Sequence, residues 1–324
     1  MNQNIALIKN PVSRLNQKED KEFTDFALNW LGENYSTPRT VDDMMQTLNR
    51  FVATGVDCII IDGGDGTISH VMTAIYSCYP HDKLPSLIIL PSGNTNLIAK
   101  DIGFGIRGIN ALKRIRTLAE RQRLHFTVQH RHALKIEWSD PSRPPVLGMF
   151  QGAAAFTKAI QIAHNPTILK NFPHDGAVAI TIITSLLKLF FSKTRDLWLN
   201  GNACSFFIDE KKSYQENCFL FLSTTLQNLS HGMWPFFNRY AGDDSLHYLN
   251  VKARPPHLLA ACFALLRGKT PEWLLNDPNY LSGTANKIKL SIKEDIILDG
   301  EQFDTGEDHC ILLSTGPKFS FVRL

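Results

Sequence analysis

Hydrophobic positions along the first 120 residues switch repeatedly between two periodicities. Short runs of aliphatic and β-branched residues alternate with longer segments in which apolar residues recur every three or four positions. The runs predict strands at residues 5–8, 57–61 and 85–90, and the longer segments predict helices at 21–31, 41–54, 68–79, 96–102 and 109–119. Strands that alternate with helices predict a doubly wound α/β domain, with a mostly parallel sheet covered on both faces.

The pattern changes after about residue 124, where short segments of alternating polar and apolar residues begin. They predict strands at 125–129, 133–138, 203–208, 218–223, 246–251, 287–292, 311–314 and 319–322. Helical segments interrupt them at 153–163, 177–191 and 256–267. This half therefore predicts an antiparallel β-sandwich-like domain that carries helices. We expect one domain at 1–124 and a second at 125–324, with the last strands returning to the first domain.

The third predicted strand runs directly into Gly63-Gly64-Asp65-Gly66-Thr67. In a parallel sheet, ligands bind at the carboxyl ends of the strands. Glycine lets backbone N–H groups approach an anion closely, and the helix that follows adds the positive end of its dipole. The loop therefore predicts a phosphate site, in which Asp65 holds Mg²⁺ or takes a proton. A tight turn with Asp65 as helix cap is the alternative.

A second loop of the same kind ends the next predicted strand. Ser92, Gly93, Thr95 and Asn96 follow Pro91 and open another helix. Hydroxyl and amide side chains suit phosphate oxygens or the edge of an adenine ring. Two adjacent strand ends would form a two-sided cradle, and an ordinary capped turn is again the alternative.

These two loops, together with Asp299-Gly300-Glu301 near the C-terminus, resemble the diacylglycerol kinase catalytic domain family of bacterial lipid kinases and sphingosine kinases. Asn10-Pro11 matches the family's N-P after the first strand, and Thr37 matches the start of its nucleotide segment. Two positions depart from the family pattern: Arg14 replaces a glycine, and Leu97 replaces an acidic residue. The sequence is therefore identified as a divergent member.

The resemblance implies an ATP- and Mg²⁺-dependent kinase acting on a hydroxyl of a diacylglycerol-like lipid. Glu301 is implied as the base, with Asp65 as its catalytic partner, so the fold would have to bring these two distant residues together. The metal segment is matched approximately by Asp243-Asp244-Ser245-Leu246, which together with Asp65 gives the metal candidates. The implied nucleotide contacts are Asn10, Thr37, Gly63, Gly64, Asp65, Gly66, Thr67, Ser92, Gly93, Thr95 and Asn96.

Two other functions stay open on the sequence. One is a kinase of NAD or of another small soluble alcohol, since the motifs do not fix the acceptor. The other is a nucleotide-binding regulator without transfer activity, which the departures at Arg14 and Leu97 keep open. Gly103 to Gly108 also fits G-x-G-x-x-G, but a helix precedes it, so we interpret it as a turn between helices.

The net charge and the cysteine content limit which binding partners and which cellular compartment we expect. The formal net charge is +3, which gives no argument for nucleic-acid binding but leaves contact with an anionic membrane surface open. The six cysteines form no C-x-x-C pair, and we expect them to be reduced core residues of a cytoplasmic protein. No secretory signal is visible at the start of the sequence. A homodimer is one assembly to test.

Transient contact with a membrane, at its inner face, is expected because the implied substrate is a lipid. The apolar stretch 177–191 is short for a bilayer span and is interrupted by Lys188, so we expect a buried helix, with lipid contact as the alternative. The Trp234–Phe237 cluster predicts core packing, with an acyl-chain site as the alternative. The basic run of residues 113–123 predicts a solvated helix face or, alternatively, a membrane-facing patch.

Overall fold

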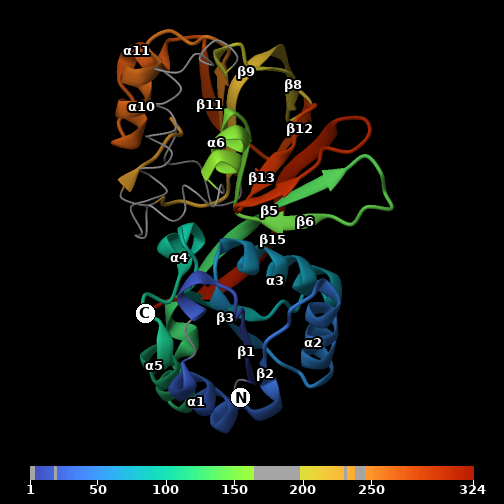
Figure 1. Ribbon diagram of the computed structural model, residues 1–324, viewed down its shortest axis with the longest axis vertical. Coiled ribbons are helices and arrows are strands. Elements are labelled where there is room, and N and C mark those ends of the chain that lie inside the picture. The colour runs from blue at the N-terminus through green and yellow to red at the C-terminus, as the bar shows by residue number, and fades with distance from the viewer. Residues whose placement is uncertain (1–3, 18–19, 164–197, 230–231, 238–244) are drawn as a thin grey trace. The chain divides into compact units, whose positions relative to one another are not determined.

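The computed structural model describes residues 4–17, 20–163, 198–229, 232–237 and 245–324 (Figure 1). The chain divides into two compact units. Unit 1 comprises Met1–Ala133 and Pro317–Leu324, and unit 2 comprises Leu134–Gly316. Two strands, β5 (Val128–Trp138) and β15 (Cys310–Val322), therefore begin in one unit and end in the other.

Unit 1 is built on a parallel sheet with the strand order β2-β1-β3-β4, and β15 lies next to β4. The strands are apolar and buried along almost their whole length, as expected for a sheet covered on both faces. Helices α1 and α5 pack together, and α2 packs on α3 (Figure 1). The bounds are β1 (Ile5–Lys9), β2 (Tyr35–Ser36), β3 (Cys58–Gly63), β4 (Ser86–Pro91), α1 (Lys21–Leu31), α2 (Val41–Ala53), α3 (Asp65–Cys78), α4 (Leu97–Ile102) and α5 (Gly108–Glu120), with 3₁₀ turns η1 (Arg14–Asn16), η2 (Gly32–Asn34) and η3 (Leu124–Thr127).

The doubly wound α/β prediction is confirmed, and most predicted elements of unit 1 lie within three residues of the observed ones. The prediction was least accurate at the phosphate loop. Helix α3 begins at Asp65 rather than at residue 68, because Asp65, Gly66 and Thr67 already form its first turn. The G-x-G-x-x-G segment is a turn between α4 and α5, as interpreted, with Gly105 and Gly108 at positive φ.

Unit 2 is dominated by antiparallel strands in the order β14-β13-β7-β9-β8-β12-β15, with β10 between β9 and β11 and a hairpin of β5 and β6. This confirms the antiparallel character of the second half. The bounds are β6 (Val146–Gly148), β7 (Phe150–Ala154), β8 (Asn202–Ile208), β9 (Lys212–Thr224), β10 (Leu246–Lys252), β11 (Tyr280–Ala285), β12 (Lys287–Ile292), β13 (Ile296–Leu298), β14 (Glu301–Phe303), α6 (Ala155–Ala163), α10 (Leu258–Leu266) and α11 (Glu272–Leu275).

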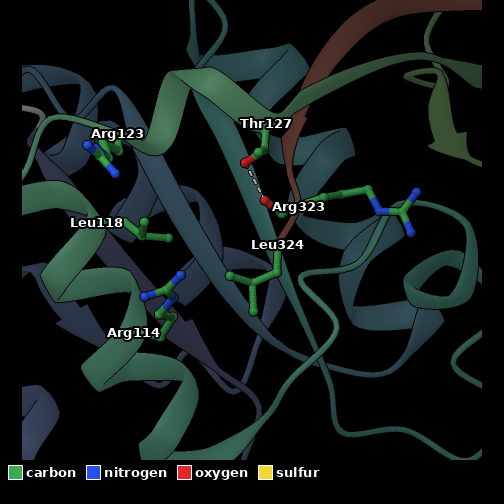
Figure 2. Close-up of a pocket in the computed structure, with 6 residues that line it drawn as sticks. All are labelled: Arg114, Leu118, Arg123, Thr127, Arg323 and Leu324. Atoms are coloured by element: carbon green, nitrogen blue, oxygen red, sulfur yellow. Dashed lines mark hydrogen bonds between the residues drawn. The ribbon is translucent and has the colours of Figure 1, made fainter.

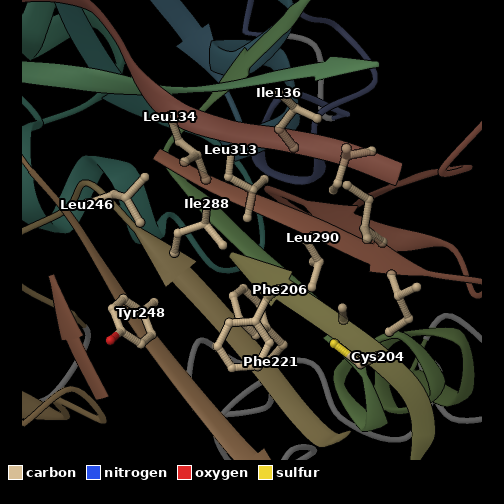
Figure 3. Packing of buried hydrophobic residues seen from close by; sticks show 14 of the residues in the cluster. Leu134, Ile136, Cys204, Phe206, Phe221, Leu246, Tyr248, Ile288, Leu290 and Leu313 are labelled. Atoms are coloured by element: carbon tan, nitrogen blue, oxygen red, sulfur yellow. The ribbon is translucent and has the colours of Figure 1, made fainter. Parts of the chain in front are cut away.

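Large side chains from five strands form the core of unit 2. Phe206 from β8, Phe221 from β9, Tyr248 from β10, Ile288 from β12 and Leu313 from β15 meet in it (Figure 3). The rings of Phe206 and Phe221 lie 5.6 Å apart at their centroids and are tilted, a favourable aromatic arrangement. The strands of unit 2 are therefore held together by a continuous apolar core.

Several predictions for the second half were wrong in detail. Residues 125–129 form the turn η3 and only the start of β5, and the two strands predicted at 311–314 and 319–322 are the single strand β15. Strands β6, β7, β11, β13 and β14 were not predicted. The core packing predicted for the Trp234–Phe237 cluster is confirmed for Trp234 and Phe236, which are buried against the ring of His247.

Within the described part of the chain, no helix is long and apolar enough to cross a membrane. The stretch 177–191, predicted as a buried helix, lies outside the described residues. All six cysteines are free thiols, as expected, and four of them are buried.

Candidate nucleotide site

Strand register brings three loops of unit 1 to the same edge of the sheet. Lys9 of β1 is paired with Asp62 of β3, and Gly63 of β3 is paired with Pro91 of β4. The segments that follow these residues therefore start side by side at the carboxyl ends of the strands, where α/β sheets bind ligands. Thr37 follows β2, one residue beyond the pair Ile8–Ser36, so it lies at the level of Lys9.

The two glycine loops pack against each other backbone to backbone. A Cβ atom placed on Gly93 would lie 2.5 Å from the Cα of Gly64, and one placed on Gly64 would lie 3.1 Å from the Cα of Gly93. A Cβ on Gly63 would lie 2.7 Å from the Cβ of Thr67. The sequence analysis explained these glycines by the approach of an anion. The structure adds a second reason, because side chains here would push the loops apart.

Asp65 fastens the second loop to the first. Its Oδ2 accepts a hydrogen bond from the backbone N–H of Leu97 at 2.9 Å, and its Oδ1 accepts one from Ile98 at 2.9 Å. These N–H groups belong to the first turn of α4, which receives no side-chain cap from Asn96. Burial raises the pKa of the Asp65 carboxyl, and the two backbone N–H donors and the charge of Lys100 act against this rise. The carboxylate is thus a cap for α4, reaching it from another element.

The side chain of Asn96 is used within its own loop. Its Oδ1 accepts from the N–H of Gly93 at 2.8 Å, and its Nδ2 donates to the carbonyl of Gly93 at 3.0 Å. Asn96 also adopts the left-handed conformation (φ 48°), which asparagine tolerates better than most residues. Its role in the structure is to shape the second loop, and its contact to nucleotide stays a prediction.

The start of α3 has backbone N–H groups that precede its first backbone hydrogen bond. The first N–H of the helix to bond a backbone carbonyl at this end is that of Ile68, which donates to Gly64 at 3.1 Å. No side chain caps this start. The N–H groups of Asp65, Gly66 and Thr67 precede that bond, and such groups at a helix N-terminus are anion donors.

The loop after β1 supports this helix start. Asn10 donates its Nδ2 to the Thr67 hydroxyl at 2.8 Å, and its backbone N–H donates to the carbonyl of Asp62 at 2.9 Å. Arg14, the residue that departs from the family's glycine, donates to Oδ1 of Asn94 at 3.1 Å. The arginine therefore links the first loop to the second across the strand ends. Thr37 is exposed and Thr95 is partly exposed.

A buried acid beneath the loops was missed by the sequence analysis. Asp62 is 3% exposed and accepts a hydrogen bond from the hydroxyl of Ser92. Burial raises the pKa of the Asp62 carboxyl, while the donors Ser92 and Asn16 and the charges of Lys9 and Arg107 oppose the rise. Lys9 is itself 6% exposed, with its ammonium 4.4 Å from the ring centroid of Phe23. The signal in the sequence was an acid at the last position of an apolar strand.

Glu301 belongs to unit 2, at the first position of β14. Asp299 and Gly300 form the two-residue turn between β13 and β14, both at positive φ (48° and 91°), as a type I′ hairpin requires. The carboxylate of Asp299 accepts from the N–H groups of Met149 at 2.8 Å and Phe150 at 3.0 Å. The D-G-E motif is therefore a hairpin pinned to the segment at β7, with Glu301 partly exposed beside the pinned turn.

The predicted metal segment is only partly described. Asp243 and Asp244 lie outside the described residues, and Leu246 is the first residue of β10, fully buried and paired with Ala285. Among the residues that the structure describes, no group of three or more His, Cys, Asp or Glu side chains is arranged to hold a metal ion. The metal candidates therefore stay predictions.

Comparison with known proteins bears on the same region. Residues 4–128 match the family model of the diacylglycerol kinase catalytic domain. The probable lipid kinase YegS of Escherichia coli (strain K12 / DH10B) is 47% identical over 49 residues, which cover 15% of this chain. The match spans 16% of the length of that relative.

Two solved structures share the fold over nearly the full length. A putative diacylglycerol kinase from Bacillus anthracis str. Sterne has a TM-score of 0.64 at 17% identity, covering 99% of this chain and 96% of that one. A second diacylglycerol kinase structure from the same organism has a TM-score of 0.60 at 17% identity, with the same coverage. At this identity the likeness shows a common fold.

Proposed function

We propose that the chain is a lipid kinase, because residues 4–128 match the family model of the diacylglycerol kinase catalytic domain. It transfers the γ-phosphoryl group of ATP, in the presence of Mg²⁺, to a hydroxyl of a diacylglycerol-like lipid. The observation that carries the proposal is the start of α3, which has no side-chain cap and whose Thr67 hydroxyl accepts a hydrogen bond from Asn10. Asp65 and Gly64 join this start to the second loop.

Phosphoryl transfer depends on positioning and on neutralising charge. In this proposal the N–H groups of Asp65, Gly66 and Thr67 bind the phosphates of ATP, and the dipole of α3 favours their negative charge. The hydroxyl of Thr67, oriented by Asn10, provides a further donor. Asp65 acts as a positioning residue, because both of its oxygens hold the second loop in place.

Mg²⁺ commonly keeps several waters and binds through substrate phosphates together with one or two carboxylates. Such a site needs no cluster of three protein ligands. When bound, the ion would neutralise phosphate charge. Asp65 and the predicted pair Asp243 and Asp244 are the candidate carboxylates.

Glu301 is proposed as the general base that takes the proton of the acceptor hydroxyl. Its support is the family motif together with the rigid hairpin beneath it. Asp299 fixes that hairpin through two backbone hydrogen bonds, so the backbone at Glu301 is well positioned while its side chain stays partly exposed.

A lipid substrate requires contact with a membrane surface, and unit 2 offers an apolar surface for it. Leu259 and Phe263 of α10 and Trp273 and Leu275 of α11 are exposed, with Phe263 at 53%. Helix α11 lies near the start of α10, since the rings of His257 and Trp273 are 5.8 Å apart (Figure 1). We propose that this α10–α11 surface makes the transient contact, at the cytoplasmic face of the membrane.

The test is an assay of the full chain with radiolabelled ATP, Mg²⁺ and vesicles containing diacylglycerol, with products separated by thin-layer chromatography. Labelled phosphatidic acid would support the proposal. Label transferred to NAD or another soluble alcohol, but to no lipid, would replace it with a soluble-substrate kinase. ATP binding without any labelled product would replace it with a regulator. Sedimentation equilibrium of the same sample would test for a homodimer.

A further inference from the structure

Unit 1 contains a cavity of about 390 Å³, open to solvent, that has no part in the proposed reaction. It lies between the second half of α5, the turn η3 and the last residues of the chain. Its volume is in the range of small-molecule sites. The lining residues are Arg114, Leu118, Arg123, Thr127, Arg323 and Leu324 (Figure 2).

Arg114 of α5 and Arg123, which follows this helix, differ from the other cationic side chains of α5. Lys113 is paired with Glu22 at 3.3 Å, and Arg116 is paired with Glu120 at 2.8 Å. Within the described part of the chain, the guanidinium groups of Arg114 and Arg123 have no acidic partner within 4.0 Å. Among the described residues, no acidic side chain lines the cavity either. Both arginines are exposed, and two guanidinium groups without an acidic side-chain partner can bind a carboxylate or a phosphate.

The third arginine at the cavity, Arg323, contributes its backbone to the cavity wall rather than its charge. Arg323 donates from its guanidinium to Oε1 of Gln129 at 3.1 Å, and its side chain extends away from Arg114 and Arg123 (Figure 2). Its backbone closes one side of the cavity, because its N–H donates to the carbonyl of Thr127 at 2.8 Å and its carbonyl accepts from the Thr127 hydroxyl. This wall is therefore fixed by backbone contacts, while the charge comes from Arg114 and Arg123.

The remaining surface of the cavity is apolar. Leu118 lies on α5 between the two arginines in sequence, and Leu324 faces it from the end of the chain (Figure 2). A fully hydrated inorganic ion would leave these two side chains in contact with water. An apolar group attached to the anion would instead cover them, which is favourable by the hydrophobic effect.

We propose that this cavity binds a small amphipathic anion, a carboxylate or phosphate monoester that carries a short apolar group. The charged head lies on Arg114 and Arg123, and the apolar group lies between Leu118 and Leu324. The inference does not rest on the proposed kinase function, because none of these residues contributes to the nucleotide loops.

The experiment is calorimetric titration of the full chain, without ATP, with hexyl phosphate, hexanoate, inorganic phosphate and hexanol. We expect hexyl phosphate or hexanoate to bind at one site, and inorganic phosphate and hexanol to bind at least about tenfold more weakly, since each lacks one of the two interactions. Arg114→Gln and Arg123→Gln should each weaken binding by about tenfold or more, the effect of losing a charged hydrogen bond. Arg121→Gln is the matched control, because Arg121 is exposed two residues from Arg123 but does not line the cavity.

Leu118→Gln separates the apolar interaction from the charge. It should weaken the binding of hexyl phosphate and leave that of inorganic phosphate unchanged. Equal affinity of the wild type and both arginine variants would overturn the proposal, as would displacement of hexyl phosphate by ATP, which would assign the binding to the nucleotide loops. Sedimentation with vesicles of phosphatidic acid identifies the source of the anion. Loss of vesicle binding in the arginine variants indicates a bilayer lipid, and unchanged vesicle binding indicates a free amphiphile.

Discussion

Gly64 and Gly93 meet so closely that a Cβ atom on Gly93 would lie 2.5 Å from the Cα of Gly64. The contact joins the loop after β3 to the loop after β4, and the neighbouring hydrogen bonds from Leu97 and Ile98 to Asp65 join the same two loops. The proposed phosphate site is therefore assembled from two loops that have to fit each other before any ligand arrives.

Gly93→Ala should disturb this fit. The added methyl group meets backbone that has no rotamer to change, and overpacking of this kind costs about 1–3 kcal/mol in the free energy of unfolding. We expect a lower urea midpoint and weaker ATP binding. Thr95→Ala, in the same loop but without the backbone contact, is the control for stability, since Thr95 is itself a predicted nucleotide contact. If the Gly93→Ala protein kept wild-type stability and ATP affinity, the close contact of the two loops would not be required for either property.

Asp65→Asn tests whether this residue positions the loop. An amide retains one acceptor oxygen and replaces the other with a donor that faces an N–H group of α4, so we expect a loss of about 1–3 kcal/mol in stability. ATP affinity should fall in proportion to the fraction of molecules in which the second loop keeps its native position. Hydrogen exchange at Leu97 and Ile98 measures this directly and should accelerate. Unchanged exchange at these two amides would contradict the cap.

The buried Asp62 should make stability depend on pH. Its pKa is raised in the folded state, so the folded protein holds the proton more tightly than the unfolded chain does. The stability that Asp62 contributes is therefore fully present below its unfolded pKa of about 4 and is lost as the pH rises through its higher folded pKa.

Asp62→Asn should remove this part of the pH dependence in urea unfolding measured from pH 3 upward, on a scale where one pKa unit corresponds to about 1.4 kcal/mol. Ser92→Ala removes a donor that lowers the pKa, so it should raise the folded pKa further and extend the sloping region to higher pH. Parallel pH profiles for the wild type and Asp62→Asn would show that Asp62 does not titrate differently on folding.

Glu301→Gln should separate chemistry from binding. General-base catalysis contributes roughly 10²–10⁴-fold, so kcat should fall by about that factor while ATP affinity stays unchanged. Glu307→Gln, an exposed acid of the same unit, is the control. Near-full kcat in Glu301→Gln would eliminate it as the base, and lost ATP affinity would indicate a structural or metal-binding role.

Membrane contact should depend on the α10–α11 surface. Phe263→Ser and Trp273→Ser each remove an exposed apolar side chain and should reduce sedimentation with phosphatidylglycerol vesicles, because each aromatic ring contributes about 1.5–3 kcal/mol when it is fully transferred out of water. Val41→Ser, at an even more exposed apolar position of unit 1, should have no effect. Equal vesicle binding by all three variants would move the contact to another surface.

Sequence patterns predicted the elements with strong periodicity. Helix α1 (Lys21–Leu31) and strand β12 (Lys287–Ile292) have the predicted bounds, because an amphipathic face or a strict alternation marks both ends. Strand β13, with only three residues, gives no such signal, although Asp299-Gly300 is a recognised hairpin turn. The position of a short strand is determined by the strands that pair with it. The pattern of residues along the sequence does not contain this pairing.

The sequence analysis named residues of the candidate site but not the contacts that they make with one another. The glycine loops and Asp65 were predicted as a ligand site, whereas the contact between Gly64 and Gly93 depends on the register of β3 and β4. Asp62 was missed for the same reason. An acid at a strand end is ordinarily solvated, and only the pairing with Lys9 and the position of Ser92 place it in the interior.

The division of unit 1 into two segments of chain has a consequence for biosynthesis. Residues 317–324 supply Phe319 and Phe321, both fully buried, yet they are translated after all of unit 2. Domains commonly fold from the N-terminus during synthesis, but here the first unit to emerge from the ribosome lacks part of its interior until unit 2 has been translated. The nascent first unit thus exposes the surface that these rings will cover, and it depends on unit 2 to deliver them.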